Sequence, residues 1–123
     1  FLGERRDVPD LMARSDLFLN TSHYEGFSVA ILEAMAMALP VVATDVAGNR
    51  GLVRSAQNGL LCPPDKPETL AAAILQLADD PSLYRQYSAG ALATSREYTI
   101  ENAAARHLEL YSSLLRLRTP QKD

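Results

Sequence analysis

Short apolar runs alternate with longer helical patterns along this 123-residue chain. The runs at residues 16–20, 41–44 and 60–62 are brief and bounded by polar residues, glycine or proline, which is typical of buried strands. Between the first two lies segment 29–39, rich in Ala, Met and Leu, which predicts a helix ending at Pro40. Strand, helix and strand with short connections form a βαβ unit, so we expect the strands to be parallel.

Polar caps and prolines predict where the helices begin. The expected cap and first-turn residues, each with its helix, are Asp7 and Pro9 (7–15), Ser28 (29–39), Asp65 with Glu68 and Pro67 (to about 78), and Asp80 and Pro81 (to about 96). The spacing of Asp65 and Glu68 resembles a capping box. The other expected elements are the tail of a strand (1–3), a turn (45–49), a short helix (near 50–56), a turn (58–59), a last helix (100–117) and a frayed tail (119–123).

The last expected helix has an unusually broad apolar face. Its main stripe consists of Ala103, Leu110, Leu114 and Leu117. With the neighbouring apolar positions the face spans roughly 180°, against the ~100° that one packing surface needs. Two interpretations stay open: a helix that touches two bodies, of which this chain holds one, or a well-buried terminal helix.

The pattern as a whole predicts an α/β fold with a short parallel sheet flanked by helices and a helical C-terminal region. The length suits one small domain. The chain begins "FLGERRDVP" without a methionine, like the end of a strand running into a loop. We therefore expect a piece of a longer protein, cut within a domain. Exposed sheet edges and the broad helix face then predict self-association of the isolated chain.

Composition excludes several classes. The net charge is −3 and no basic patch is interleaved with aromatic residues, which argues against nucleic-acid binding. A single cysteine, Cys62, excludes an internal disulfide and fits a reducing compartment; its apolar surroundings favour a buried structural thiol. His23 and His107 have no metal-ligand spacing. No apolar run approaches the ~20 residues needed to span a bilayer.

One glutamate interrupts the apolar run "VAILEAMAMAL". Burying an unpaired carboxylate costs several kcal/mol, so either Glu33 faces water or a polar partner waits for it. Ligands of open α/β sheets bind beyond the carboxyl ends of the strands, and the loop there contains Glu25 and Gly26. The start of the next helix suits an anion such as a phosphate. Carboxylates bind vicinal hydroxyls well, so Glu25 and Glu33 could hold a sugar over this helix start; the alternative is that both are ordinary solvent-facing charges.

The stretch "EGFSVAILEAMAMALPVVATDVAGN" resembles the signature of retaining GT-B glycosyltransferases, the large family four of group 1 glycosyl transferases. The shared features are Glu-Gly-Phe, a second glutamate eight positions after the first, Ala-Met-Ala and Pro-Val-Val-Ala-Thr. The flanks "FLGERRDVPDLMARSDLFLNTS" and "NGLLCPPDKPETLAAAILQLADDP" agree too, so the resemblance covers nearly the whole chain. It implies that residues 1–118 are part of a Rossmann-like C-terminal, donor-binding domain.

The resemblance also implies roles for particular residues. Glu25 would be the catalytic residue, acting on the hydroxyls of the donor sugar as a positioner and electrostatic aid. Glu33 would bind the ribose, and Arg6 in loop 3–6 would lie near the base. The backbone amides would hold the sugar and the diphosphate at Gly26, Phe27, Ser28, Val29 and Ala30. The reaction would transfer a sugar from a nucleotide-sugar to an acceptor hydroxyl with retention, without cofactor or bound metal.

Two positions depart from the family pattern. Ala38 stands where a glycine is usual, and Gly51 where a glutamate is frequent, which puts a contact at the nucleotide end in doubt. The basic segment that grips the diphosphate and the N-terminal acceptor domain would both precede this chain. The site would then be a cleft of which this chain forms part of one wall.

Two other functions remain open: a non-catalytic binding or scaffold domain that kept the fold, and a sugar-nucleotide epimerase of the same fold. For the leading interpretation the partners are a nucleotide-sugar donor, an acceptor glycan or lipid-linked glycan, and the N-terminal domain. The expected setting is polysaccharide or lipopolysaccharide synthesis, in the cytoplasm or at the inner face of the membrane through the N-terminal domain.

Overall fold

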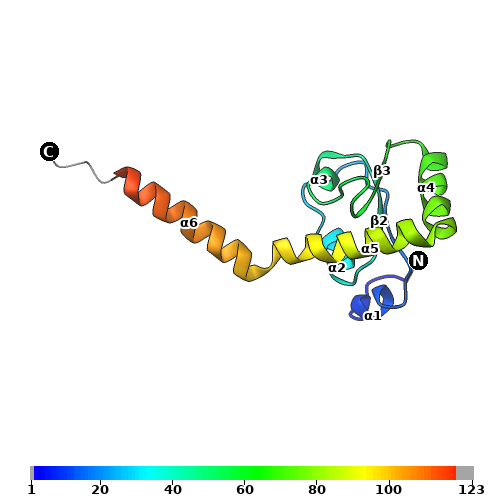
Figure 1. The fold of residues 1–123 in the computed structure, drawn as a ribbon, viewed down its shortest axis with the longest axis horizontal. Coiled ribbons are helices and arrows are strands. Elements are labelled where there is room, and N and C mark those ends of the chain that lie inside the picture. Colours follow the sequence, from blue (N-terminus) through cyan, green and yellow to red (C-terminus); the bar gives the residue numbers. More distant parts are fainter. Residues whose placement is uncertain (1, 119–123) are drawn as a thin grey trace.

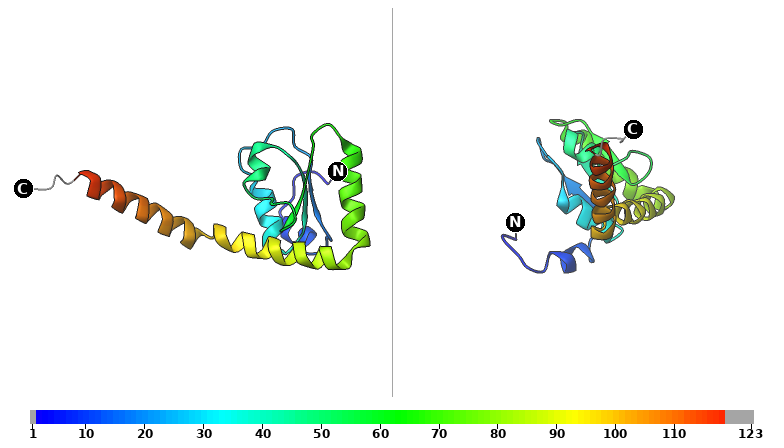
Figure 2. Two further views of the ribbon diagram at one scale, coloured as in Figure 1. Left: turned by 45° about the horizontal axis from the view of Figure 1, so that its top comes forward. Right: turned by 90° about the vertical axis from the view of Figure 1, so that its left-hand side faces the viewer.

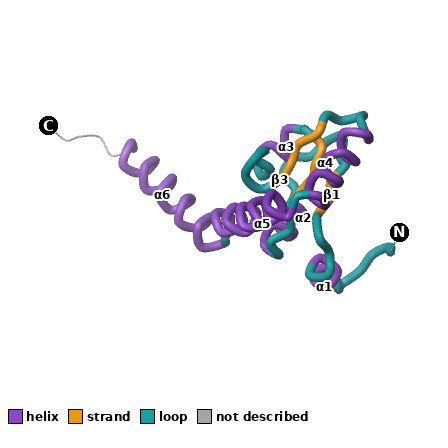
Figure 3. Tube along the Cα trace, turned by 45° about the vertical axis from the view of Figure 1, so that its right-hand side comes forward, coloured by secondary structure: helices purple, strands orange, loops and turns teal. Residues whose placement is uncertain are grey.

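A three-stranded parallel sheet forms the centre of the molecule in the computed structural model, which describes residues 2–118 and side chains up to residue 116. The strands, orange in Figure 3, are β1 (Phe18–Asn20), β2 (Val41–Thr44) and β3 (Gly59–Cys62). Their spatial order is β1-β2-β3. Val41 of β2 pairs with Phe18 of β1 and with Gly59 of β3. The predicted α/β class and parallel strands are confirmed.

Helices cover both faces of this sheet. In chain order the helices of the molecule are α1 (Val8–Met12), α2 (Val29–Ala36), α3 (Ala47–Arg50), α4 (Pro67–Asp79), α5 (Pro81–Ser95), the 3-10 helix η1 (Arg96–Tyr98) and α6 (Ile100–Arg118), of which α6 projects away from the sheet (Figure 1). Successive residues of β2 point to opposite faces. Val41 and Ala43 pack with α2 and α5, whereas Val42 packs with α4. Because β2 is central and covered on both sides, all four of its residues are buried.

Several local predictions are confirmed. Strand β2 has the predicted limits. Ser28 caps α2, its hydroxyl accepting a hydrogen bond from the Ile31 N–H, and Asp80 caps α5 in the same way. Cys62 is a free, buried thiol, and burial raises its pKa.

Other local predictions are wrong. Leu2 and Gly3 lie in a loop rather than a strand, while Phe1 and the expected frayed tail at 119–123 lie outside the described residues. Helix α1 is shorter than predicted. Asp7 occupies its N-cap position, but the carboxylate pairs with Arg5 and makes no capping hydrogen bond. The guanidinium of Arg5 lowers the pKa of Asp7 accordingly.

The connection from β2 to β3 also differs from the prediction. A helix, α3, forms where a turn was expected, and of the helix expected near residues 50–56 only Arg50 is helical, as the last residue of α3. Gly59 begins β3 instead of closing a turn. A Cβ on Gly59 would lie 2.2 Å from the Val41 carbonyl oxygen, so glycine is required for β3 to approach β2.

The departure at Ala38 has a backbone explanation. Ala38 follows the last turn of α2 with φ 58°, and the Leu39 N–H donates to the Ala34 carbonyl at 3.1 Å. This is the helix-ending motif that normally uses glycine, because a Cβ is strained in the left-handed region. The departure therefore concerns the end of a helix rather than a ligand contact.

We expect Ala38→Gly to raise the free energy of unfolding by about 0.5–1 kcal/mol, since relief of strain exceeds the added entropy of the unfolded chain. Urea unfolding of the two proteins measures the difference. Ala71→Gly, an exposed position inside α4, is the matched control and should lose about 1 kcal/mol. A loss of stability in both variants would contradict the strain at Ala38.

Helix α4 begins one residue later than the capping-box prediction. Its N-cap is Lys66, whose side chain makes no capping hydrogen bond, and Asp65 instead adopts φ 62°. The expected pairing of Asp65 with Glu68 is therefore wrong: a left-handed residue directs its side chain away from the first turn.

Lys66→Asp should consequently stabilise the fold by about 1 kcal/mol, because it supplies a side-chain acceptor for the Glu68 N–H and a negative charge at the helix start. Thermal or urea unfolding tests this. Lys66→Ala removes the lysine without adding an acceptor and should change stability little. Equal effects of the two variants would show that the missing cap is not the cause.

Helix α6 leaves the body of the molecule. It continues beyond α5 and η1 and projects away from the sheet (Figures 1 and 2). Its large apolar side chains are exposed, with Ile100 at 80% and Leu108 at 65%. The interpretation as a well-buried terminal helix is therefore wrong for the described residues, and self-association through this face stays a prediction. Within residues 2–118, no helix combines the length and apolarity needed to cross a membrane.

Candidate functional site

The loop at residues 21–27 lies between the carboxyl end of β1 and the start of α2, where open α/β sheets bind their ligands. It carries Glu25, Gly26 and Phe27 and leads directly into Ser28. The structure therefore places the predicted sugar-binding and diphosphate-binding segments at one edge of the sheet.

Glu25 is held by one of its two carboxylate oxygens. Its Oε1 accepts hydrogen bonds from the Ser22 hydroxyl at 3.0 Å and from Asn20 Nδ2 at 3.4 Å. The other oxygen, Oε2, has no hydrogen-bond partner among the described residues. The half-buried carboxylate is thus oriented by the protein while one oxygen stays available to a ligand.

The backbone of this loop rests on α3. A Cβ added to Gly48 would lie 2.4 Å from the Glu25 carbonyl oxygen and 2.7 Å from that of Gly26. Thr44, at the end of β2, donates its hydroxyl proton to the Ser22 carbonyl. Glycine at position 48 therefore lets α3 support the loop that carries Glu25.

The N-terminus of α2 is open to a ligand. Ser28 is buried and caps the Ile31 N–H, so the N–H groups of Val29 and Ala30 are left without acceptors in the described chain. Both residues are exposed. A Cβ at Gly26 would meet no atom within 4 Å, so open space lies above the loop. Free amides at a helix start favour an anion, with phosphate as the usual example.

Phe27 packs against a residue that the sequence pattern did not single out. Its ring lies 5.7 Å from that of Tyr98, and the Tyr98 hydroxyl donates to the Gly51 carbonyl at 3.2 Å. Helix η1 thereby contacts both the site loop and the residue after α3. Gly51 itself has room for a side chain, since a Cβ at this position would lie 3.6 Å from the nearest atom.

Glu33 proves to be exposed rather than buried. It lies at the rim of a groove of about 180 Å³ between α1 and α2, together with Val8, Pro9, Met12, Ala36 and Met37. The first alternative for this glutamate, that it faces water, is thus the one found. An apolar groove with a carboxylate at its rim suits a ligand with a flat apolar part and hydroxyl groups.

The arginines near the site differ in whether their guanidinium groups are already held in ion pairs. Arg5 is paired with Asp7, and the Arg50 guanidinium lies 2.6 Å from Asp45, which lowers the pKa of that carboxyl. Arg6 is exposed and forms no ion pair with the described residues. The structure places Arg6 in the loop before α1, and within residues 2–116 no ion pair joins it to Glu25 or Glu33.

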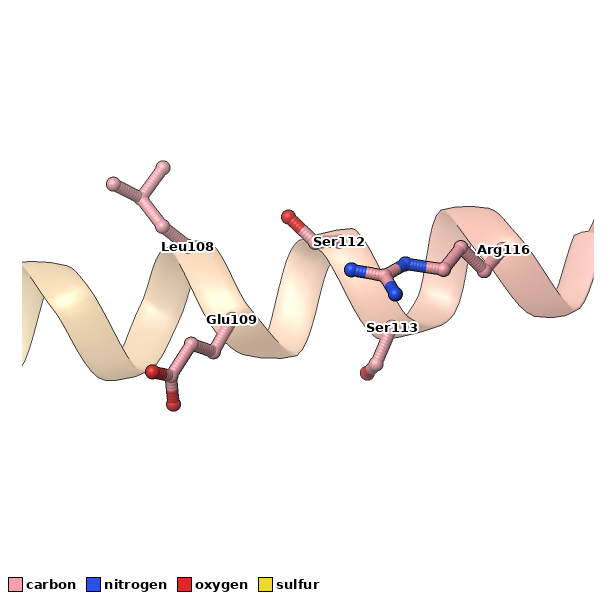
Figure 4. Close-up of a pocket in the computed structure, with 5 residues that line it drawn as sticks. All are labelled: Leu108, Glu109, Ser112, Ser113 and Arg116. Atoms are coloured by element: carbon pink, nitrogen blue, oxygen red, sulfur yellow. The ribbon is translucent and has the colours of Figure 1, made fainter.

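Two further hollows lie away from Glu33 and the α1–α2 groove. One lies between the site loop and the start of α4, where His23 Nδ1 is 3.5 Å from an Asp65 carboxylate oxygen. The other is lined by α6 alone, and Figure 4 shows its five side chains projecting from a single helix. Among residues 2–118, no group of three or more His, Cys, Asp or Glu side chains could hold a metal ion.

Sequence reasoning identified the loop and the helix start but missed the residues that support Glu25. These are Asn20, Ser22, Thr44, Gly48 and Asn49. One signal was present: Asn20 is a polar residue at the carboxyl end of a buried strand, the position at which α/β folds place functional groups.

The parallel sheet, the glutamate loop and the open helix start define a Rossmann-like ligand-binding domain. The family model described as "Glycosyl transferases group 1" matches residues 1–80, and the chain belongs to this family. The chain is 38% identical over 119 residues to the lipopolysaccharide core biosynthesis mannosyltransferase LpsB of Rhizobium meliloti (strain 1021), covering 94% of this chain and 34% of that relative. It therefore spans about a third of that protein.

Solved structures agree with this assignment. The structure of Anabaena Alr3699/HepE in complex with UDP aligns with a TM-score of 0.85 at 35% identity, covering 92% of this chain and 32% of that one. The same protein in complex with UDP-glucose aligns with a TM-score of 0.83. The fold is accordingly that of part of the C-terminal domain of GT-B glycosyltransferases, as the sequence predicted.

Proposed function

We propose that this chain forms the donor-binding part of a glycosyltransferase, which transfers a sugar from a nucleotide-diphosphate sugar to an acceptor hydroxyl with retention. The observation that carries the proposal is the Glu25 carboxylate, held through Oε1 with Oε2 free, next to the open N-terminus of α2. The similarity to a protein solved with UDP and UDP-glucose supports it. The acceptor, the N-terminal domain and a cytoplasmic setting in polysaccharide or lipopolysaccharide synthesis belong to the same proposal.

Each part of the site then has a chemical task. Glu25 Oε2 accepts hydrogen bonds from hydroxyl groups of the donor sugar and keeps that sugar oriented as the glycosidic bond breaks. The amides of Val29 and Ala30 meet the diphosphate, whose charge they favour. Glu33 binds the ribose, and the α1–α2 groove and Arg6 lie toward the base. No bound metal or cofactor is invoked.

The proposal is tested on the whole protein that carries this chain. Calorimetric titration with UDP and GDP and with their common hexose conjugates should show binding of one nucleotide series, and the matching nucleotide-sugar should support transfer. Binding without transfer or hydrolysis for any donor would favour the scaffold interpretation. Interconversion of donor epimers without transfer would favour the epimerase.

The structure weakens one argument for the scaffold. Of the two departures, Ala38 lies at the end of α2 and affects helix termination, so it says nothing about lost activity. The Gly51 carbonyl accepts a hydrogen bond from Tyr98, whose ring packs against Phe27 of the site loop. Gly51 is therefore the departure that concerns the surroundings of the proposed ligand.

Substitution of Glu33 should weaken nucleotide binding by roughly 1.5–3 kcal/mol, because a charged acceptor of two ribose hydroxyls is lost. Calorimetry with the nucleoside diphosphate on Glu33→Gln and Glu33→Ala measures the effect. Glu68→Ala, at an exposed position on α4, is the control and should bind normally. Unchanged affinity in both Glu33 variants would show that the ribose lies elsewhere.

A further inference from the structure

The side chain of Asn20 links Glu25 to the interior of the domain. Its Oδ1 accepts hydrogen bonds from the Ser22 N–H at 3.1 Å and from Asn49 Nδ2 at 3.3 Å. These two donors determine which end of the carboxamide is the oxygen. Nδ2 is thereby directed at Glu25 Oε1, 3.4 Å away.

Asn49 is the buried end of this chain of contacts. It is 0% exposed, and its Nδ2 donates to the Thr44 carbonyl at 2.9 Å as well as to Asn20. A flipped carboxamide would place its oxygen against these acceptors, so only one orientation fits. The Asn49 Oδ1 atom is buried without a hydrogen-bond partner in the described structure.

This arrangement is not what packing alone would favour. An orphaned buried acceptor is unfavourable, and an apolar side chain of similar volume would avoid it. What compensates for this unpaired oxygen is the hydrogen bond that Asn49 Nδ2 donates to Asn20. That bond orients Asn20, and Asn20 in turn orients the Glu25 carboxylate. Local rules of stability are broken most often where a site needs a particular geometry.

We propose that Asn20 and Asn49 are positioning residues that act in series to hold the Glu25 carboxylate in the orientation used on the donor sugar. This inference rests on the proposed function of Glu25. Ser22 fixes the same oxygen from the loop side, so Oε1 is held by two donors and Oε2 faces the ligand. Asn49 acts only through Asn20 and touches no ligand.

The physical link is tested first on this chain, without any activity. Proton–nitrogen correlation spectra report the side-chain amides of Asn20 and Asn49, with exposed Asn102 as the internal reference. Glu25→Gln should shift the Asn20 amide signals, and Asn49→Asp should shift them too, while Asn102 stays unchanged. Unchanged Asn20 signals in both variants would overturn the link.

The kinetic test uses Asn20→Asp in the whole enzyme. Aspartate keeps the shape of Asn20 and the acceptor for Ser22 and Asn49, but it replaces the donor to Glu25 with a repelling oxygen. The turnover number should fall roughly 10- to 100-fold through misplacement of the carboxylate, with the donor KM changed less than about 3-fold. Asn49→Asp buries a charge and should also destabilise the fold, so a loss of turnover in that variant could have two causes. Asn20→Asp is therefore the variant that tests the positioning role.

Gln76→Glu adds the same charge on the exposed surface of α4 and should leave turnover unchanged. A parallel fall in stability, kcat and donor affinity for Asn20→Asp would show a merely structural role and overturn the proposal. Full activity of Asn20→Asp beside an inactive Glu25→Ala would overturn it as well. Full activity of Glu25→Ala would instead refute the function proposed for Glu25, and the positioning role with it.

Discussion

Replacement of Glu25 by alanine should lower the turnover number of the whole enzyme by about 100- to 1,000-fold, the loss typical of removing one preorganised polar group that acts on the transition state. Nucleotide affinity should change much less, because the proposed contact of Glu25 is with the donor sugar, whereas the nucleotide contacts are proposed for Glu33 and the start of α2. The comparison requires kcat for transfer and calorimetric binding of the nucleoside diphosphate, measured on the same preparations.

The control is Glu97→Ala, which removes an exposed carboxylate whose contact is with Arg54. It should leave both quantities near the wild-type values. Equal losses of donor-analogue affinity and rate in Glu25→Ala would make Glu25 a binding residue only. Unchanged kinetics would remove it from the mechanism.

The second large effect concerns stability. Gly90→Ala should destabilise the domain by about 3 kcal/mol, although alanine is the better helix former by about 1 kcal/mol. A Cβ at position 90 of α5 would lie 2.0 Å from the Gln57 carbonyl oxygen and 2.9 Å from its carbon. Backbone cannot move aside as a flexible side chain can, so α5 would have to shift.

Such a shift would disturb the core. Ala91, next in α5, is fully buried against the cluster formed by α2 and β2, and Thr94 accepts a hydrogen bond from buried Asn58 at 2.9 Å. Urea unfolding gives the free energies. Gly51→Ala is the matched control, because its Cβ has room at φ −66°, and it should be neutral or slightly stabilising. A stabilised Gly90→Ala protein would mean that helix propensity outweighs the contact.

Local patterns were sufficient for much of the architecture. The run Val41–Thr44 predicted a buried strand, and the helix between two such strands predicted a parallel arrangement. Ser28 predicted the start of α2, because an N-cap side chain accepts a hydrogen bond from the backbone N–H three residues later. The loop at residues 21–27 and the start of α2 were candidate site segments from the sequence, because they follow directly on a buried strand of a parallel sheet.

Local sequence patterns did not predict where two backbone segments come into close contact. Gly48, Gly59 and Gly90 each admit a backbone carbonyl from another segment, and a glycine required for such an approach looks in the sequence like one in a turn. The assignment of Gly59 to a turn was wrong for this reason. The capping pattern likewise placed the N-cap of α4 one residue too early, at Asp65 instead of Lys66. The positive φ of Asp65 keeps this residue outside the helix, and local sequence did not predict that angle.

The support of Glu25 was decided by tertiary structure alone. Asn20 and Asn49 are 29 residues apart and meet only because β1 and β2 pair in parallel and α3 folds back over their carboxyl ends. The sequence by itself determined the parallel sheet, and it singled out the loop after β1 and the two glutamates as candidates, because these follow from short-range periodicity and spacing. The orientation of the carboxylate depends on hydrogen bonds between distant segments, and those exist only once the sheet has formed.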